Sequence, residues 1–356
     1  MWPPPDFLEA QTVETVLGPI PANQLGVTLP HEHFYCVSTA ANFSPLTTPD
    51  ADDLANSSIT LEMRGWLEYN WQSNRDNLRL DDEATAIAEA IRYRSSGGAT
   101  VIDVTPIGIG RNPLGLAKIA RAADINVVMG SSFYVASTHP ASVEAMSRDQ
   151  IAELIIDEFA NGVEDTAIKP GVIGEVGCSW PLIADERKVL QASALAQQEL
   201  AAALYVHPGR NPDAPFEIIG ILSDAGADLT RVVMCHIERT IQDFESLRAL
   251  LSHGCYIEYD LFGLETTGSY YTKLGITMPS DSQRISQIRH LNDSDYGNKI
   301  LISHDICFKH RLAKYGGSGY DHILNNVVPL MYANGYVAAD IERLMVTNPR
   351  RVIAGV

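Results

Sequence analysis

The 356-residue sequence predicts an α/β protein, specifically a (β/α)8 TIM barrel with a long insertion after the first strand and extra helices near the C-terminus. Short apolar segments alternate with helical segments along most of the chain, a pattern typical of βαβ units and a parallel sheet. Eight such apolar segments occur, and eight is the number that closes a barrel. A doubly wound open sheet stays as the alternative, because counting strands does not demonstrate closure.

The eight expected strands are apolar at most positions, as strands buried on both faces require. We place them at 26–29, 100–104, 126–130, 172–176, 203–206, 231–235, 255–259 and 300–303. Helical periodicity fills the intervals, and we expect helices at 82–95, 112–123, 147–159, 185–202 and 244–252. The helix at 185–202 begins with acidic residues, which favour a helix N-terminus.

Two segments depart from this alternation. Residues 36–80 are rich in Ser, Thr, Asn and Trp, and an insertion of this length in a compact domain usually serves function. From Asp321 onward, apolar helices are expected to pack around the barrel. Because no repeat, low-complexity tract or linker divides the chain, we predict one domain over residues 1–356.

The composition narrows the classes of partner. The chain has 26 Lys and Arg against 44 Asp and Glu, a net charge of −18, which disfavours nucleic acid and anionic membranes as partners. No apolar run is long enough to span a membrane, and residues 1–6 lack the basic and apolar regions of a secretory leader. Five scattered cysteines indicate free thiols in a reducing compartment, so we expect a cytoplasmic protein.

Metal-ligating residue types occur where five of the predicted strands end. These residues are His31, His33, Glu175, His207, His236 and Asp305. In a barrel the C-terminal ends of the strands open into one mouth, so the six side chains are expected to converge there. A single histidine at a strand end is more commonly a hydrogen-bonded structural residue, but the coincidence of six favours a metal site.

The His31-Glu32-His33 motif places two imidazoles at a spacing of two residues. On an extended backbone both side chains face the same side, so the pair can chelate one metal ion. His207 and His236 would hold a second ion, and a carboxylate between the two ions can bridge them. This mixture of nitrogen and oxygen ligands suits two Zn ions, with Mn, Co or Fe as alternatives. His304 precedes Asp305 on a strand, so its side chain should point away from the barrel axis.

Four motifs are spread over the chain, namely LPHEH at 29–33, GVIGEVG at 171–177, SHD at 303–305 and YGGSGY at 315–320. Together they resemble the phosphotriesterase family of the amidohydrolase superfamily. The resemblance covers nearly the whole chain and is weakest before Gly18 and across the insertion.

The resemblance implies a ligand set. It implies that His31, His33 and Asp305 bind the more buried metal ion, and that His207 and His236 bind the more exposed one. The founding phosphotriesterases bridge the two ions with a carbamylated lysine on strand four. This chain has Glu175 near that point, so the resemblance implies that the Glu175 carboxylate bridges directly.

The predicted site favours hydrolysis. Two divalent ions lower the pKa of a shared water, and one of them polarises the scissile carbonyl or phosphoryl oxygen. Asp305 is the expected catalytic residue that accepts the proton of the water and passes it to the leaving group, with Glu175 between the metals. The sequence has no Gly-x-Ser-x-Gly elbow that would supply a competing nucleophile.

Residues that follow other strand ends suggest how a substrate is bound. Arg210, Arg111, Lys309 and Arg311 would form a cationic rim for an anionic small molecule. The alternative is that these cations pair with carboxylates of the loops. Tyr134 and aromatic residues of the insertion would line the pocket, or belong to the core.

The resemblance implies hydrolysis of small N-acyl amides, such as N-acetyltaurine and N-acetyl amino acids, as the first choice. Lactone opening is the second choice, and promiscuous phosphotriester hydrolysis is the third. A non-catalytic ligand-binding barrel is the rival from another class, which a metal-free protein would favour. Gly108-Ile109-Gly110 is too short for a nucleotide-binding loop. Similar proteins are commonly homodimers, so a homodimer is possible.

Overall fold

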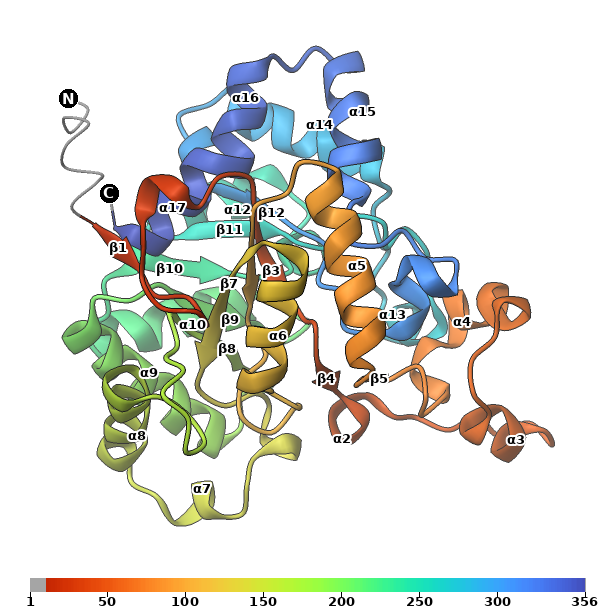
Figure 1. Ribbon diagram of the computed structural model, residues 1–356, viewed down its shortest axis with the longest axis horizontal. Helices are drawn as coiled ribbons and strands as arrows, with labels where there is room; N and C mark the ends of the chain where they lie inside the picture. The colour runs from red at the N-terminus through yellow and green to blue at the C-terminus, as the bar shows by residue number, and fades with distance from the viewer. Residues whose placement is uncertain (1–10, 356) are drawn as a thin grey trace.

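The computed structural model describes residues 11–355, and its centre is a sheet of eight parallel strands arranged in chain order (Figure 1). The strands are β3 (Thr28–Glu32), β6 (Thr100–Asp103), β7 (Asn126–Ser131), β8 (Val172–Gly177), β9 (Leu204–His207), β10 (Val232–Met234), β11 (Tyr256–Tyr259) and β12 (Ile300–Ile302). Consecutive strands pair in parallel. The eight predicted strands are therefore confirmed, although the first starts later than expected and continues through Glu32.

The first and last strands complete the barrel through a side chain. Ser303, which follows β12, donates from Oγ to the His31 carbonyl (2.8 Å) and accepts from the His31 backbone N–H (3.2 Å). The backbone N–H of Asp305 also donates to the His31 carbonyl (3.3 Å). These contacts join β12 to β3, so the fold is a (β/α)8 TIM barrel and not an open sheet.

Helices surround the strands, and their ends follow the sequence signals for capping. The main helices are α5 (Glu83–Ser95), α6 (Pro113–Ala123), α8 (Arg148–Asn161), α9 (Ala184–Leu200), α10 (Ala214–Asp224), α12 (Phe244–Leu251) and α14 (Asp281–Asn292). Asp82 accepts from the Thr85 N–H at the start of α5 (2.6 Å), and Ser147 forms a capping box with Gln150 at the start of α8. Such caps satisfy backbone donors that the first helical turn leaves free. The five predicted helices are confirmed.

Shorter elements occupy the loops and the C-terminal region. They are β1 (Thr12–Val13), β2 (Ile20–Pro21), α7 (Ser142–Ala145), α11 (Ile237–Thr240), α13 (Ser269–Lys273), α15 (Val328–Ala333), α16 (Ala338–Glu342) and α17 (Asn348–Ala354). α15 and α16 lie beside α14, and α17 packs against β1, β3 and β12, so the tail covers the barrel as expected (Figure 1). Residues 1–6, from which we argued that a leader is absent, lie outside the described residues.

The predicted insertion is present and extends to one side of the barrel (Figure 1, orange). Its ends pair as antiparallel strands β4 (Cys36–Val37) and β5 (Arg79–Leu80), with α2 (Thr39–Asn42), α3 (Ala51–Asn56) and α4 (Arg64–Asn70) between them. Trp71 anchors the insertion to the barrel mouth, because its ring stacks on Phe308 with centroids 4.4 Å apart. The insertion therefore forms part of the wall above the strand ends.

Side chains alternate between the barrel interior and the helices, and this alternation positions the predicted ligands. In β9, Tyr205 packs in the interior cluster, whereas Leu204 and Val206 pack toward the helices. The next inward position is His207, and it lies at the mouth. The five cysteines are free thiols, and no helix within residues 11–355 is long and apolar enough to cross a membrane.

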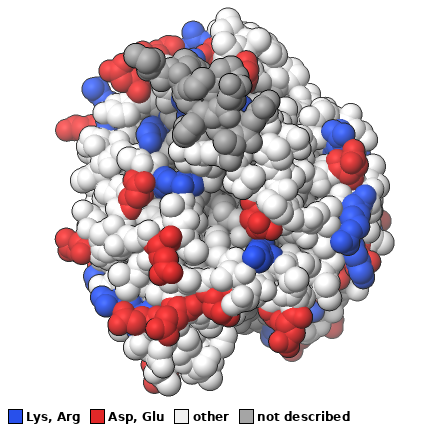
Figure 2. Space-filling model, turned by 60° about the vertical axis from the view of Figure 1, so that its left-hand side comes forward, with Lys and Arg blue, Asp and Glu red and all other residues white. Residues whose placement is uncertain are grey.

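The surface is charged in a way that fits the composition. On the face that Figure 2 shows, Lys and Arg side chains are scattered among Asp and Glu and form no single broad basic surface. That distribution gives no support on this face to a polyanionic partner.

Candidate metal centre

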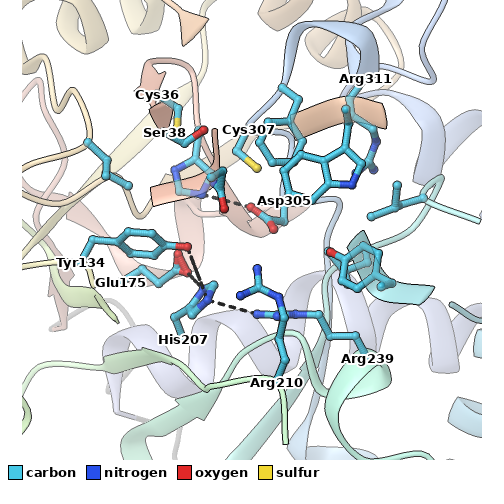
Figure 3. A pocket seen from close by; sticks show the side chains of 18 residues that line it. Cys36, Ser38, Tyr134, Glu175, His207, Arg210, Arg239, Asp305, Cys307 and Arg311 are labelled. Atoms are coloured by element: carbon cyan, nitrogen blue, oxygen red, sulfur yellow. Dashed lines mark hydrogen bonds and ion pairs between the residues drawn. The ribbon is translucent and has the colours of Figure 1, made fainter. Parts of the chain in front are cut away.

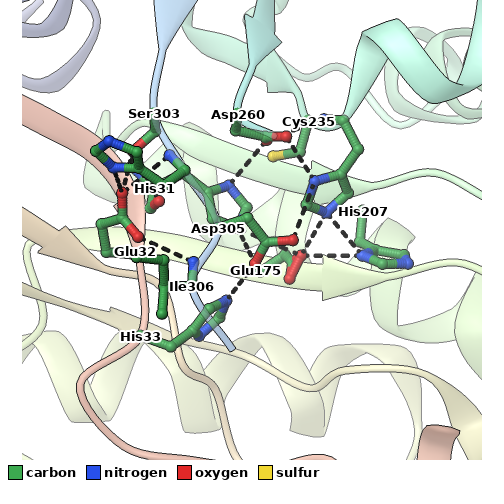
Figure 4. A network of polar contacts seen from close by, with 12 residues as sticks. His31, Glu32, His33, Glu175, His207, Cys235, Asp260, Ser303, Asp305 and Ile306 are labelled. Carbon is green, nitrogen blue, oxygen red and sulfur yellow. Dashed lines mark hydrogen bonds and ion pairs between the residues drawn. The ribbon is translucent and has the colours of Figure 1, made fainter. Parts of the chain in front are cut away.

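The two histidines of the first strand point into the barrel, as their spacing predicts (Figure 4). His31 lies on β3 and His33 follows its end, and the two ring centroids are 5.5 Å apart. Both side chains are buried. Because His31 is fully enclosed and His33 faces the cavity, the pair runs from the barrel interior to the pocket.

Glu175 on β8 lies at the centre of the predicted ligands. Its Oε2 is 3.0 Å from His207 Nδ1 and 3.2 Å from His236 Nε2, and it is 3.7 Å from His31 Nε2. Its strand shifts register against β9 between Ile173 and Val176, which accompanies the inward position of the carboxylate. Glu175 therefore contacts histidines of both predicted metal sites.

Asp305, which follows β12, is the last member of the cluster. Its Oδ1 is 3.2 Å from His33 Nε2 and 3.8 Å from His31 Nε2. Its backbone is left-handed (φ 49°), as is that of His236 (φ 53°), so in both cases the chain turns sharply just past a strand end. Left-handed conformations of residues other than glycine are strained and are commonly retained at functional sites.

The six predicted ligands fit a metal centre in their chemistry as well as their proximity. They form three overlapping groups whose ligand atoms lie within 4.8 Å of one another: His31, His33 and Glu175; Glu175, His207 and His236; and His31, His236 and Asp305. The buried Nε2 of His31 has no hydrogen-bond partner among the described residues, although carboxylate oxygens surround it. An unpartnered imidazole nitrogen facing carboxylates is the arrangement a divalent cation would satisfy.

The opposite ring nitrogens are held by residues that the sequence analysis missed. His31 Nδ1 lies 3.1 Å from Glu258 Oε2, and His236 Nδ1 lies 2.8 Å from Asp260 Oδ1. His33 Nδ1 lies 2.8 Å from Thr105 Oγ1. Partners of this kind fix the tautomer and orientation of ligating histidines. Glu258 lies on β11 and Asp260 lies just past its end, at a spacing of two residues. That spacing is the signal in the sequence that would have revealed them.

Burial acts to lower the pKa of all four histidines, but nearby acidic groups outweigh burial at His31 and His33, where the pKa is raised. Burial lowers the pKa of His207 to about 4, despite the opposing effect of Glu175, so the ring is neutral near pH 7 with a lone pair available. Burial opposes ionisation of Glu175 and Asp305, but contacts with histidines outweigh it. His207 and His236 lower the pKa of Glu175, and His236 and His33 lower that of Asp305.

Glu32, the middle residue of the HEH motif, points away from the cluster. Its Oε1 lies 2.6 Å from His304 Nδ1 and accepts from the His304 backbone N–H (2.9 Å). Its Oε2 accepts from the Ile306 N–H (3.0 Å). The prediction that His304 faces away from the axis is confirmed. These contacts hold the backbone on both sides of Asp305, which makes Glu32 a positioning residue.

An open cavity of about 540 Å³ lies over the cluster (Figure 3). His33, Glu175, His207 and Asp305 form part of its floor, and its wall includes Trp71, Ile109, Leu261, Leu264, Phe308 and Tyr271. Tyr134 lines the cavity as predicted, and its hydroxyl is 3.1 Å from His207 Nδ1. Arg210 also lines it as predicted, together with Arg311 and the unpredicted Arg239.

The structure does not bring Arg111 and Lys309 to this cavity, which corrects their predicted place on its rim. Arg111 is buried and bonds both oxygens of Glu158 (2.7 Å each). Lys309 pairs with Asp76 (2.5 Å). The alternative that these cations pair with carboxylates therefore holds for both. Their partners are distant in sequence, so pairing could not be read from local spacing.

A parallel barrel whose mouth gathers four histidines, a glutamate and an aspartate defines the class of metal-dependent hydrolases. The sequence matches the model of the phosphotriesterase family over residues 11–353. The chain therefore belongs to the phosphotriesterase family, as the four motifs indicated.

Three similar proteins show how closely the chain follows this family. N-acetyltaurine hydrolase of Rattus norvegicus is 42% identical over 340 residues, 95% of this chain and 97% of that protein. Phosphotriesterase-related protein of Nematostella vectensis is 44% identical over 339 residues, with the same coverage. The crystal structure of a resiniferatoxin-binding protein from Rhodobacter sphaeroides has a TM-score of 0.93 at 34% identity, covering 98% of this chain and 96% of that chain. The chain is a hydrolase.

Proposed function

We propose that this hydrolase cleaves small N-acyl amides, with N-acetyltaurine as the first substrate to test, by means of two metal ions. The observation that carries the proposal is Glu175, which contacts His31, His207 and His236 beneath a cavity that also exposes Asp305. The name of the Rattus norvegicus relative supports the substrate class.

The ligands divide into two sets. His31, His33 and Asp305 would hold one ion, His207 and His236 would hold the other, and Glu175 would lie between them. Bound divalent ions supply a water of lowered pKa and polarise the amide carbonyl. Zn is our first choice because histidine and carboxylate ligands suit it, with Mn, Co or Fe as alternatives.

Asp305 is the proposed proton carrier. Its carboxyl is ionised, because His236 and His33 hold its pKa low against the effect of burial, and it faces the cavity, where it would accept a proton from the attacking water. It then returns that proton to the leaving nitrogen. An amide needs this step more than an activated ester does, because an amine leaves poorly as an anion.

Tyr134 is the proposed hydrogen-bond donor to the substrate carbonyl. Burial and the nearby Glu175 raise the pKa of its hydroxyl well above the ordinary value, so the hydroxyl keeps its proton. It lies beside His207 at the cavity wall (Figure 3). A donor fixed at this place would stabilise negative charge that develops on the carbonyl oxygen.

The test is hydrolysis of a panel by metal-loaded protein. The panel holds N-acetyltaurine, N-acetyl-β-alanine, a γ-lactone, a δ-lactone and paraoxon. We expect N-acyl amides to react fastest, and we expect Glu175→Gln and Asp305→Asn to lose at least about 100-fold in kcat. Glu199→Gln, an exposed position on α9, is the matched control. Faster opening of lactones would overturn the amide assignment and keep hydrolysis, whereas metal loading without turnover of any substrate would favour the ligand-binding alternative.

A further inference from the structure

Two arginines reach the cavity beside His207, one from each of two neighbouring loops (Figure 3). Arg210 follows β9, and Arg239 lies on α11, three residues after His236. The Arg239 side chain is buried, and its Nη2 lies 3.3 Å from His207 Nε2. One imidazole ring therefore separates the Arg239 guanidinium from the Glu175 carboxylate, because the other nitrogen of that ring is 3.0 Å from Glu175 Oε2.

Neither arginine has an acidic partner. Among residues 11–355, no carboxylate lies within ion-pair distance of Arg210 or Arg239. Nε of Arg210 and Nη1 of Arg239 are buried without a hydrogen-bond partner among these residues. The Arg210 guanidinium instead lies over the Tyr270 ring, 4.9 Å from its centroid. Arg239 is buried and Arg210 is half-buried. Cations withdrawn from water without counter-charges are costly, so the two arginines indicate an anion that the protein itself does not supply.

Two other buried arginines of this chain are paired with carboxylates. Arg111 bonds both oxygens of Glu158, and Arg284 contacts Glu238 and Asp281. Arg311 also lines the cavity; its Nη2 donates to the backbone carbonyls of Phe262 and His304, but its buried Nε has no hydrogen-bond partner among residues 11–355. Arg210 and Arg239 therefore differ from Arg111 and Arg284, whose guanidinium groups are neutralised within the fold.

We infer that Arg210 and Arg239 form an anion subsite that binds a sulfonate or carboxylate at the amine end of the N-acyl amide. The inference rests on the proposed function and adds the basis on which the enzyme selects anionic substrates. A planar guanidinium offers paired donors to two oxygens of such a group. Only the His207 ring separates the Arg239 guanidinium from the Glu175 carboxylate. A substrate that reaches both places therefore has a short spacer between its anionic group and its scissile bond.

The kinetic test compares matched substrates. N-acetyltaurine is set against N-propylacetamide, a neutral amide of similar size, for the unaltered protein, Arg239→Gln, Arg239→Lys and Arg210→Gln. We expect each Gln variant to raise KM for N-acetyltaurine by about 30-fold or more, the effect of removing one partner of a buried ionic contact. The KM of the neutral amide should stay within about threefold. Arg239→Lys should recover part of the loss, because lysine keeps the positive charge but lacks the paired N–H donors of the guanidinium.

A binding measurement separates this inference from the proposed function. Calorimetry with ethanesulfonate, which has no amide, should show binding that Arg239→Gln and Arg210→Gln weaken and that the exposed variant Arg94→Gln leaves unchanged. Ethanesulfonate binding through the two arginines without turnover of any amide would refute the amide hydrolase and keep the subsite. Equal losses on the charged and neutral amides, or ethanesulfonate binding unaffected in both folded Gln variants, would overturn the subsite.

Discussion

Glu32 and His304 form a buried pair that joins the first strand to the turn after the last, with 2.6 Å between Glu32 Oε1 and His304 Nδ1. The pair faces away from the metal centre, yet Asp305 is the next residue after His304. Glu32 also accepts from the Ile306 N–H, so its two oxygens hold both neighbours of Asp305. Asp305, just past the last strand, is thus positioned by a carboxylate of the first strand.

This relationship predicts the effect of Glu32→Gln. The substituted amide keeps one acceptor oxygen and places an NH2 group where an N–H now donates, which leaves buried donors unpaired. We expect a loss of about 1–3 kcal/mol in the free energy of unfolding, together with weaker metal binding. Urea unfolding and metal titration measure the two effects. An exposed acid of the insertion changed in the same way, Glu62→Gln, should alter neither, and an unchanged metal affinity in folded Glu32→Gln would contradict the positioning role.

Asp260 is predicted to control metal affinity without touching the ions. It accepts from both His236 Nδ1 (2.8 Å) and the His236 backbone N–H (2.9 Å), and thereby fixes the ring. We expect Asp260→Asn to lower metal affinity about 10- to 100-fold. Competition with a chromogenic chelator measures the affinity, with the exposed Asp213→Asn as control. Equal affinities for Asp260→Asn and the unaltered protein would show that the ring is held by other contacts.

Metal removal is predicted to cost both activity and stability. The cluster brings Glu175 and Asp305 close to His31, and bound cations would offset that concentration of negative charge. A ligand that binds only the folded state stabilises it by mass action. Dialysis against a chelator should therefore abolish hydrolysis and lower the Tm, and adding Zn should restore both. A chelated protein that keeps its full activity would refute the metal centre.

Arg111 gives the opposite prediction from Arg239, although both are buried arginines. Nη1 and Nη2 of Arg111 donate to the two carboxylate oxygens of Glu158, away from the cavity. Arg111→Met should lower the free energy of unfolding by roughly 3 kcal/mol, because it leaves the Glu158 carboxylate without its cation, with Ser131 Oγ as its remaining hydrogen-bond donor. kcat/KM per folded molecule should not change. A selective loss for anionic substrates in Arg111→Met would restore this residue to the substrate site.

The sequence predicted which histidines and carboxylates converge, because strand ends in a barrel share one mouth. His31, His207 and His236 each follow an apolar run, so their convergence needs only the fold. Arg239 was missed because it lies on the short helix α11 beyond the strand end, where no alternation fixes its direction. The prediction that Lys309 lies on the cavity rim failed for another reason. Lys309 pairs with Asp76, 233 residues away, and only the folded chain brings the two together.

Asp281 carries a prediction on acid stability. It is buried where α14 begins, and it accepts from His322 Nε2 (2.7 Å), Arg284 Nη1 (2.9 Å) and the Gly263 N–H (2.9 Å). Burial alone would raise the pKa of its carboxyl, but these partners outweigh burial and lower it below the usual value. A carboxyl with a lowered pKa in the folded state stabilises the fold above its unfolded pKa of about 3.9.

That contribution is lost as the pH falls from about 4 through the lower pKa of the folded state. Asp281→Asn should therefore be less stable than the unaltered protein at pH 7 and at pH 5, and the difference should shrink as the pH falls below about 4. Urea unfolding at pH 7, 5 and 3.5 provides the comparison, and Asp213→Asn serves again as the exposed control. A difference that stays the same at pH 3.5 would mean that packing around Asp281, and not its charge, stabilises this corner of the barrel.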